Sequence, residues 1–312
     1  MSLYREHRPS TLDEVMGNRE LVSGIRAHFA QEPRKVSHCH IISGPSGCGK
    51  TTIARIVATE LLHASPLAIH EVNFAENRGV DTAREIIEQM KGLPLQGDSV
   101  VYILDEAHGM TPDAKRAFLK PTEETPAHVY FFFCTTNLDM FIKGDEGKAI
   151  NTRSTKWKVE PLNARQLAQL VAGVAEEEKF DLDDELLTAI VEAAAGSPRD
   201  ALVALEQVIP LAGDRKAQLK MLEGGVVTDP DTRELCQALA NGASWKTVQG
   251  LLSSMKGRVD AEAVRRGVLG YMSAILLKKA DEHIANVMDQ FSINTYDTGF
   301  PGLVLAAWHS TK

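Results

Sequence analysis

The sequence predicts an α/β fold in which a parallel β-sheet is followed by purely helical regions. In the first half, short apolar runs alternate with segments of helical periodicity, as in doubly wound sheets. A glycine-rich loop lies between the first apolar run and the first long helix. After about Pro161 the strand-like runs stop and only helical spacing remains.

The apolar runs of the first half predict buried strands. Val100–Leu104 and Val129–Cys134 are almost continuously apolar, as expected of central parallel strands that are covered on both faces. Shorter strands are predicted at 38–42 and 67–72. Helices are predicted at 51–62, 80–90 and 114–120. The second of these helices has an apolar stripe formed by Val80, Ala83, Ile87 and Met90.

The second half predicts two helical domains. Helical spacing covers 164–179, 183–195 and 198–209, and the last of these helices begins with Pro198 after the helix-ending Gly196. Residues 223–230 contain glycines and a proline that predict a linker or turn. The rest of the chain is mostly helical. We therefore expect domains at 1–160, 161–225 and 226–312.

Composition restricts the class of protein. No apolar run approaches the roughly 18 residues that span a bilayer, and the N-terminus has no signal-peptide core. The four cysteines form no C-x-x-C pair, so no zinc ribbon or disulfide framework is indicated. The net charge of −8 argues against a protein that simply coats DNA, but a local basic lining remains compatible with DNA binding. We expect an intracellular, cytoplasmic protein that does not interact with membranes.

A phosphate-binding loop is the strongest motif. Residues 44–51 satisfy G-x-x-x-x-G-K-[ST] between a strand and a helix. Lys50 is expected to reach the β- and γ-phosphates of ATP, and the hydroxyl of Thr51 to bind Mg²⁺. The residues expected to contact the nucleotide here are Gly44, Pro45, Ser46, Gly47, Cys48, Gly49, Lys50, Thr51 and Thr52. The Cys48 thiol could be reactive and protected by ATP, or turned inward and inert; the sequence leaves both open.

Acidic and polar residues follow the two strongest strands. A carboxylate at Asp105 can hold Mg²⁺, and Glu106 can polarise the attacking water. Thr136 follows the next strand, where it could contact the γ-phosphate or that water. Arg153 and Arg199 are individually ambiguous, because an exposed arginine is usually only a solvated charge.

Taken in order, these motifs resemble the AAA+ clamp-loader ATPases of the replication factor C and gamma/tau type. The opening segment, residues 4–17, is similar to the family signature that lies against the adenine, and Asp105–His108 is similar to its second nucleotide motif. Thr152-Arg153-Ser154 matches the Ser-Arg-Cys motif, and Gly196–Leu202 is similar to the sensor-2 motif. The resemblance covers roughly residues 3–210.

The resemblance implies a fold and a set of site residues. The fold is an AAA+ P-loop NTPase domain followed by a small helical lid domain and an all-helical collar domain. Tyr4, Arg8, Pro9 and Val15 are implied to bind the nucleotide. The implied catalytic residues are Glu106, Thr136 at the sensor-1 position, Arg153 acting on the ATP of a neighbouring subunit, and Arg199.

The resemblance also implies a DNA contact. Residues 77–84 are similar to the segment that tracks DNA in replication factor C subunits. Arg84 and Lys91 are spaced to share one flank of the predicted helix, and Arg78 precedes its N-terminus. The alternative, from periodicity alone, is a solvated basic edge paired with Glu85 and Glu88.

The sequence departs from the family in three places. Residues 62–67 are too few for the four-cysteine zinc module of bacterial gamma/tau subunits, and Ser154 replaces the cysteine of the Ser-Arg-Cys motif. Pro121 is expected to shorten or kink a family helix, which weakens the transfer of a coupling role to Lys120. The compact length is more like phage or archaeal and eukaryotic small subunits, so we expect a phage protein, possibly a clamp-loader large subunit.

The expected function is that of an ATP- and Mg²⁺-dependent, DNA-stimulated subunit that opens a sliding clamp and loads it onto primer-template DNA. It would work in a homo-oligomeric ring or in a ring with a companion subunit. A superfamily-2 helicase would need a second RecA-like domain, which 161–312 does not show. The chain could instead be a branch-migration ATPase, or a ring subunit that binds ATP only as a scaffold.

Overall fold

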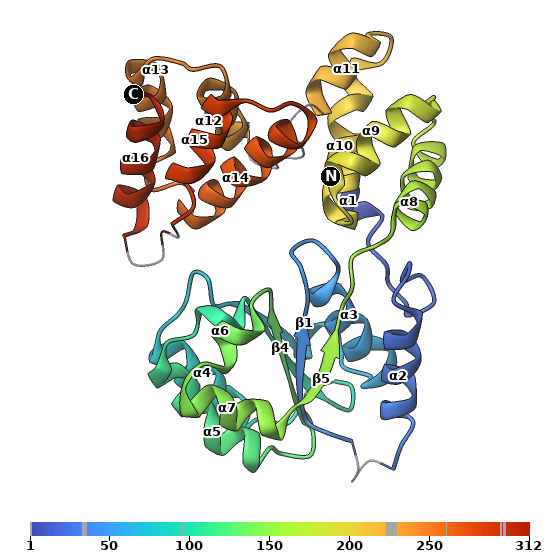
Figure 1. Cartoon of the computed structure of the whole chain (residues 1–312). Coiled ribbons are helices and arrows are strands. Elements are labelled where there is room, and N and C mark those ends of the chain that lie inside the picture. Colours follow the sequence, from blue (N-terminus) through green and yellow to red (C-terminus); the bar gives the residue numbers. More distant parts are fainter. Residues whose placement is uncertain are drawn as a thin grey trace. The chain divides into compact units, whose positions relative to one another are not determined.

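The computed structural model describes residues 2–32, 36–94, 96–222, 230–259, 261–293, 295 and 298–312 (Figure 1). The chain divides into two compact units. The first holds residues 3–170 together with 196–199, and the second holds 171–195 and 200–312. The residues predicted to bind the nucleotide all lie in the first unit.

A parallel five-stranded sheet forms the centre of the first unit, with the order β2-β3-β4-β1-β5. Its strands are β1 Cys39–Ser43, β2 Ile69–Asn73, β3 Val100–Asp105, β4 Val129–Thr135 and β5 Thr155–Lys158. All seven residues of β4 are buried, as its continuous apolar sequence predicts. The central strands β1, β3 and β4 are parallel, so their carboxyl ends lie at the same end of the sheet. The phosphate loop follows β1 and therefore lies at this end.

Helices cover both faces of this sheet (Figure 1). Alternate residues of β4 point to opposite faces, so Phe131 and Phe133 pack with one group of helices, whereas Phe132 and Cys134 pack with the other. The first face is covered by α4 Val80–Gln89, α5 Pro112–Glu123, α6 Leu138–Ile142 and α7 Gly144–Arg153. The second is covered by α2 Arg19–Phe29 and α3 Lys50–Ile56. Shorter elements of this unit are α1 Leu3–Glu6, the π-helix η2 Val57–Leu61 and the 3₁₀ turns η3 Pro66–Ala68 and η4 Ala107–Gly109.

The structure tests two sequence predictions about these helices, and the expected shortening of α5 is wrong. Pro121 does not shorten α5, which continues through it to Glu123. Proline only removes one intrahelical N–H donor here, and Glu124 N still donates to Lys120 O at 2.9 Å. In α4 the predicted stripe is largely confirmed, because Ala83 and Met90 are buried in the core and Ile87 packs against it. Ile86, which the prediction left out, is also buried, so the apolar face is wider than predicted.

From residue 161 on, the described chain is helical. The helices are α8 Ala164–Glu177, α9 Asp184–Ala194, α10 Pro198–Val208, the 3₁₀ turn η5 Ile209–Leu211, α11 Arg215–Leu222, α12 Pro230–Ala240, α13 Trp245–Met255, α14 Ala261–Lys278, α15 Glu282–Gln290 and α16 Gly299–Ser310. Helices α12 to α16 share one apolar core, which includes Leu235, Val268 and Phe291. The predicted linker at 223–230 lies outside the described residues except for Pro230. No described helix is long and apolar enough to cross a membrane.

A buried histidine in β1 makes the stability of the first unit depend on pH. His40 is fully buried, and its Nδ1 accepts a hydrogen bond from Trp157 Nε1 at 3.2 Å. Burial lowers the pKa of His40 to about 3. Below its ordinary value of 6.5, the unfolded chain therefore binds a proton that the folded chain does not.

We expect the free energy of unfolding to fall as the pH decreases from 6.5 toward 3, because only the unfolded state gains this proton. Replacing His40 by phenylalanine should reduce that slope by about 1.4 kcal/mol per pH unit. Denaturant unfolding of both proteins between pH 6.5 and 5 measures it. Equal slopes in the two proteins would contradict this account of His40.

Candidate nucleotide-binding site

The phosphate loop has the backbone that its glycines predict. Gly47 and Gly49 have φ angles of +72° and +97°, in the left-handed region that disfavours other residues. A Cβ on Gly47 would lie 2.1 Å from Ser197 Oγ, so this glycine also permits a close approach of the segment that carries Arg199. The loop leads directly into α3, whose first residue is Lys50. This arrangement directs backbone N–H groups and a helix N-terminus at one point, as anion binding requires.

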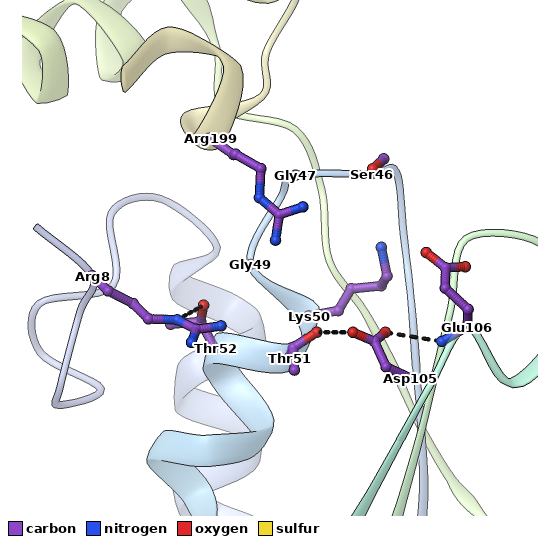
Figure 2. A pocket seen from close by; sticks show the side chains of 10 residues that line it. All are labelled: Arg8, Ser46, Gly47, Gly49, Lys50, Thr51, Thr52, Asp105, Glu106 and Arg199. Atoms are coloured by element: carbon purple, nitrogen blue, oxygen red, sulfur yellow. Dashed lines mark hydrogen bonds between the residues drawn. The ribbon is translucent and has the colours of Figure 1, made fainter. Parts of the chain in front are cut away.

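A polar hollow of about 340 Å³, partly open to solvent, lies above this loop. Three cationic side chains line it: Arg8, Lys50 and Arg199. Figure 2 shows Arg8 and Arg199 reaching toward the loop from the N-terminal segment and from the start of α10. Lys50 is 6% exposed, and its Nζ donates to Pro45 O at 2.8 Å. Burial lowers the pKa of Lys50, while the carboxylates of Glu106 and Asp105 raise it. With the carboxylates of Asp105 and Glu106 also in the lining, the hollow has a small excess of positive charge although the chain as a whole is acidic.

Two carboxylates face these cations from the end of β3. Thr51 Oγ1 donates to Asp105 Oδ2 at 2.8 Å, and Asp105 Oδ1 accepts from the backbone N–H of Glu106 at 2.9 Å (Figure 2). The two residues predicted to bind Mg²⁺ are therefore in direct contact. Hydroxyl and carboxylate oxygens are the hard donors that Mg²⁺ prefers, so this donor set fits the ion.

The sheet also brings Thr136 to the second carboxylate. Thr136 follows β4, the neighbour of β3, and its Oγ1 donates to Glu106 Oε2 at 3.1 Å. His108, which the sequence marks only as part of a motif, lies on the same carboxylate with Nδ1 at 3.3 Å from Oε2. Ser197, the residue packed against Gly47, is likewise marked by the sequence only as part of a motif, Gly196–Leu202. Only the tertiary structure places these two residues at the site.

Of the N-terminal residues predicted to bind the nucleotide, only Arg8 is among the described residues that line the hollow. Arg8 Nε donates to Thr52 Oγ1 at 2.9 Å, and burial, followed by the charge of Arg55, lowers the pKa of Arg8. The Tyr4 ring lies beneath the Arg199 guanidinium, with 5.5 Å from its centroid to Cζ. Val15 packs against the apolar core, and neither Val15 nor Pro9 is among the described residues that line the hollow.

Neither Arg153 nor Cys48 is among the described residues that line the hollow. Arg153, at the end of α7, donates from Nη1 to Ala149 O at 3.1 Å and from Nη2 to Glu123 Oε2 at 3.2 Å. It is not among the described residues that line this chain's own hollow. The Cys48 side chain is 7% exposed and packs with the core of the second sheet face. This burial favours an inward-turned, inert thiol.

The three cations predicted to contact DNA lie along one segment, but not on one helix flank. Arg84 lies on α4, where it pairs with Asp81 at 3.1 Å. Lys91 follows the helix, which ends at Gln89, and pairs with Glu88. The prediction that Arg84 and Lys91 share a helical flank is therefore wrong. Arg78 Nε donates to Ala75 O at 3.0 Å before the helix begins.

Comparison with known proteins identifies the family of the sheet domain and of its phosphate loop. Residues 40–144 match the model of the ATPase family associated with various cellular activities (AAA). DNA polymerase III subunit gamma/tau of Mycobacterium tuberculosis is 31% identical over 236 residues, which cover 69% of this chain and 40% of that protein. DNA polymerase III subunit tau of Bacillus subtilis is 25% identical over 94% of this chain and 54% of that protein. The chain therefore spans about half or less of the length of these relatives.

Among solved structures, the RuvB Holliday junction branch migration motor of Thermotoga maritima aligns with a TM-score of 0.58. The alignment covers 87% of this chain and 91% of that chain at 18% sequence identity. At this identity the likeness concerns the fold alone.

Fold, phosphate loop and family match together define a nucleotide-binding ATPase of the AAA+ class, with a parallel sheet and a helical C-terminal region. The predicted fold class is thus confirmed. Within this class, the relatives confirm the resemblance to clamp-loader ATPase subunits of the gamma/tau type.

The geometry predicts the effect of removing the loop lysine. Lys50→Ala should weaken ATP binding by about 100-fold or more, because charge-assisted hydrogen bonds contribute about 1.5–3 kcal/mol each. Equilibrium binding of a fluorescent ATP analogue measures the affinity. Lys158→Ala, which removes an exposed lysine paired with Glu160 on the edge strand, should bind like the wild type. Retained affinity in Lys50→Ala would contradict the assignment of the phosphate site.

Proposed function

We propose that the chain is an ATP-driven clamp-loader subunit, which opens a sliding clamp and loads it onto primer-template DNA. The observation that carries the proposal is the nucleotide hollow, in which Lys50, Asp105 and Glu106 meet at the end of the sheet. The similarity to gamma and tau subunits of DNA polymerase III supports clamp loading as the use of this ATP site. We propose domain boundaries at 1–160, 161–225 and 226–312, and a site of action in the cytoplasm, that of the host if the source is a phage.

The proposed chemistry assigns one task to each part of the hollow. The loop amides and Lys50 hold the β- and γ-phosphates of ATP. Thr51 and Asp105 would hold Mg²⁺, which neutralises charge on these phosphates when bound. Glu106 accepts a proton from the attacking water, and Arg199 contacts the phosphates from the segment packed on Gly47.

The remaining residues act between subunits and on DNA. Arg153 reaches the ATP of the neighbouring subunit, which links hydrolysis to the assembly of the ring, with or without a companion subunit. ATP binding orders the subunit interfaces, and the ordered ring holds the clamp open. Primer-template DNA contacts Arg78, Arg84 and Lys91, and hydrolysis then releases the clamp. Because each subunit supplies few phosphate contacts and the ring repeats them, a net charge of −8 is compatible with DNA binding.

The DNA structure that stimulates ATP hydrolysis most distinguishes a clamp loader from a branch-migration motor. A clamp loader should be stimulated by a primer-template junction more than by a four-way junction of the same length. Steady-state ATPase measured against the concentration of each DNA makes the comparison. Preferential stimulation by the four-way junction would contradict the proposal and favour a branch-migration motor.

The DNA contact predicts a specific change in the junction response. In a variant with Arg78→Ala and Arg84→Ala, the half-saturating concentration of primer-template should rise, because phosphate contacts are lost. The slope of log affinity against log salt should become shallower by about 0.9 per lost contact. ATPase titrations at several salt concentrations measure both quantities.

A matched arginine provides the control for this variant. Arg116 is exposed and paired with Asp113 and Glu146, so Arg116→Ala should leave both the half-saturation point and the salt slope unchanged. If the Arg78 and Arg84 variant also keeps both wild-type values, these arginines are ordinary surface charges.

A further inference from the structure

The backbone of Glu106 is held in an unfavourable conformation. Its φ and ψ angles are 49° and 42°, in the left-handed region, which costs a non-glycine residue about 1–2 kcal/mol. Hydrogen bonds fix this conformation on both sides, from Glu106 N to Asp105 Oδ1 at 2.9 Å and from Gly109 N to Glu106 O at 2.7 Å. Such strain is maintained where the direction of a side chain matters.

Two polar groups from different elements lie close to one oxygen of that side chain. Thr136 Oγ1, after β4, lies 3.1 Å from Glu106 Oε2. His108 Nδ1, on the turn η4, lies 3.3 Å from the same oxygen and 3.1 Å from Thr135 Oγ1. His108 is 7% exposed, so solvent does not compete strongly for these contacts.

The hydrogen-bond network determines which His108 nitrogen carries a proton. The Thr135 hydroxyl donates to Asn137 O at 3.1 Å and accepts from Asn137 N at 3.1 Å. Its single proton is thus used, and toward His108 it can only accept. The carboxylate of Glu106 also only accepts when ionised. The hydrogen bond to Thr135 therefore requires Nδ1 to be the protonated nitrogen, and this N–H also lies next to the Glu106 carboxylate, which favours the same tautomer.

The turn that carries His108 cannot shift easily. Gly109 lies so close to the loop after β2 that a Cβ there would be 2.5 Å from Phe74 O. Ala107, on the other side of His108, is fully buried. The imidazole is therefore a fixed donor rather than a mobile one.

We propose that His108 is a positioning residue for Glu106. Its Nδ1–H edge, held in place by the hydrogen bond to Thr135, lies 3.3 Å from Oε2 and acts with the Thr136 hydroxyl to hold that oxygen, so that Oε1 is presented to the attacking water. This inference rests on the proposed role of Glu106 as the base. It assigns to the last residue of the Asp105–His108 motif a task at the reaction centre.

Two substitutions at His108 separate positioning from packing. His108→Asn keeps an N–H donor near the place of Nδ1, whereas His108→Gln moves its amide toward the place of Nε2. In His108→Gln we expect kcat for ATP hydrolysis to fall by about 10- to 100-fold, the range seen when a partner that orients a metal-binding side chain is removed. ATP affinity should not change, and His108→Asn should recover most of the rate. A wild-type kcat in His108→Gln, or equal losses in both variants, would overturn the proposal.

Combination with Glu106→Gln shows where His108 acts. If it acts through the carboxylate, adding His108→Gln to Glu106→Gln should cause no further loss in single-turnover hydrolysis; a further loss of tenfold or more would overturn the proposal. Thermal unfolding shows whether His108→Gln is stably folded. If it is not, Thr136→Val replaces it in the same pair of single and double variants, because it removes the hydroxyl donor to Glu106 from a half-exposed position. Full turnover in Glu106→Gln alone would instead reject the proposed base. Loss in Glu106→Gln without loss in the His108 and Thr136 variants rejects only this inference.

Discussion

Replacing Arg153 by alanine should leave ATP binding intact and slow hydrolysis by about 10³- to 10⁵-fold, the contribution of arginine fingers in GTPases. The physical reason is that Arg153 lies outside this chain's own hollow, so it can stabilise transition-state charge only on the ATP of a neighbour. Within the chain its guanidinium donates to Ala149 O and Glu123 Oε2. Single-turnover hydrolysis at saturating ATP measures the effect.

Mixed rings distinguish action in trans from a local effect. A subunit with Arg153→Ala keeps its own phosphate site, and a subunit with Lys50→Ala keeps its finger, so mixing the two should restore part of the rate. Glu123→Gln serves as the matched variant, because it removes the ion pair within the chain and leaves the finger free. Its hydrolysis rate should not fall. If pure Arg153→Ala hydrolyses ATP at the wild-type rate, the trans role is excluded.

Replacing Glu106 by glutamine should reduce turnover by about 10²- to 10⁴-fold while ATP still binds, because an amide cannot accept a proton from water. Glutamine preserves the size of the side chain and can still accept from Thr136 through its carbonyl oxygen. Parallel measurements of ATP affinity and of phosphate release test the two parts of this prediction. Wild-type phosphate release in Glu106→Gln would show that another group activates the water.

The sequence predicted the centre of the sheet best. Val100–Leu104 and Val129–Cys134 are buried on both faces, so their composition alone marks them as strands. The edge strand β5 was missed, because only its alternate residues are partly buried and Trp157 is its only large apolar side chain. Helix α5 was predicted too short, since the rule for proline considers one lost hydrogen bond and not the burial of Pro121 in the core.

The sequence could predict those residues of the candidate site that lie together in one short motif or at the end of one strand. The glycines, Lys50 and Thr51 lie in one motif, and the end of the strongest strand pattern marks Asp105. The contacts of Glu106 with His108 and of Arg153 with Glu123 could not be predicted, because each depends on the packing of separate elements. Lys91 was placed on α4 because periodicity does not show that the helix ends at Gln89.

The most direct test of the clamp-loader account is to measure clamp retention on primed circular DNA. The wild-type chain, together with any subunits that purify with it, is incubated with ATP, the labelled clamp from the same source and the circle. Gel filtration then separates loaded clamp from free clamp. The account predicts that clamp elutes with the DNA, and that replacing Lys50 by alanine abolishes this co-elution. Free clamp in every fraction, from a preparation whose ATPase is active and stimulated by the same DNA, would contradict it.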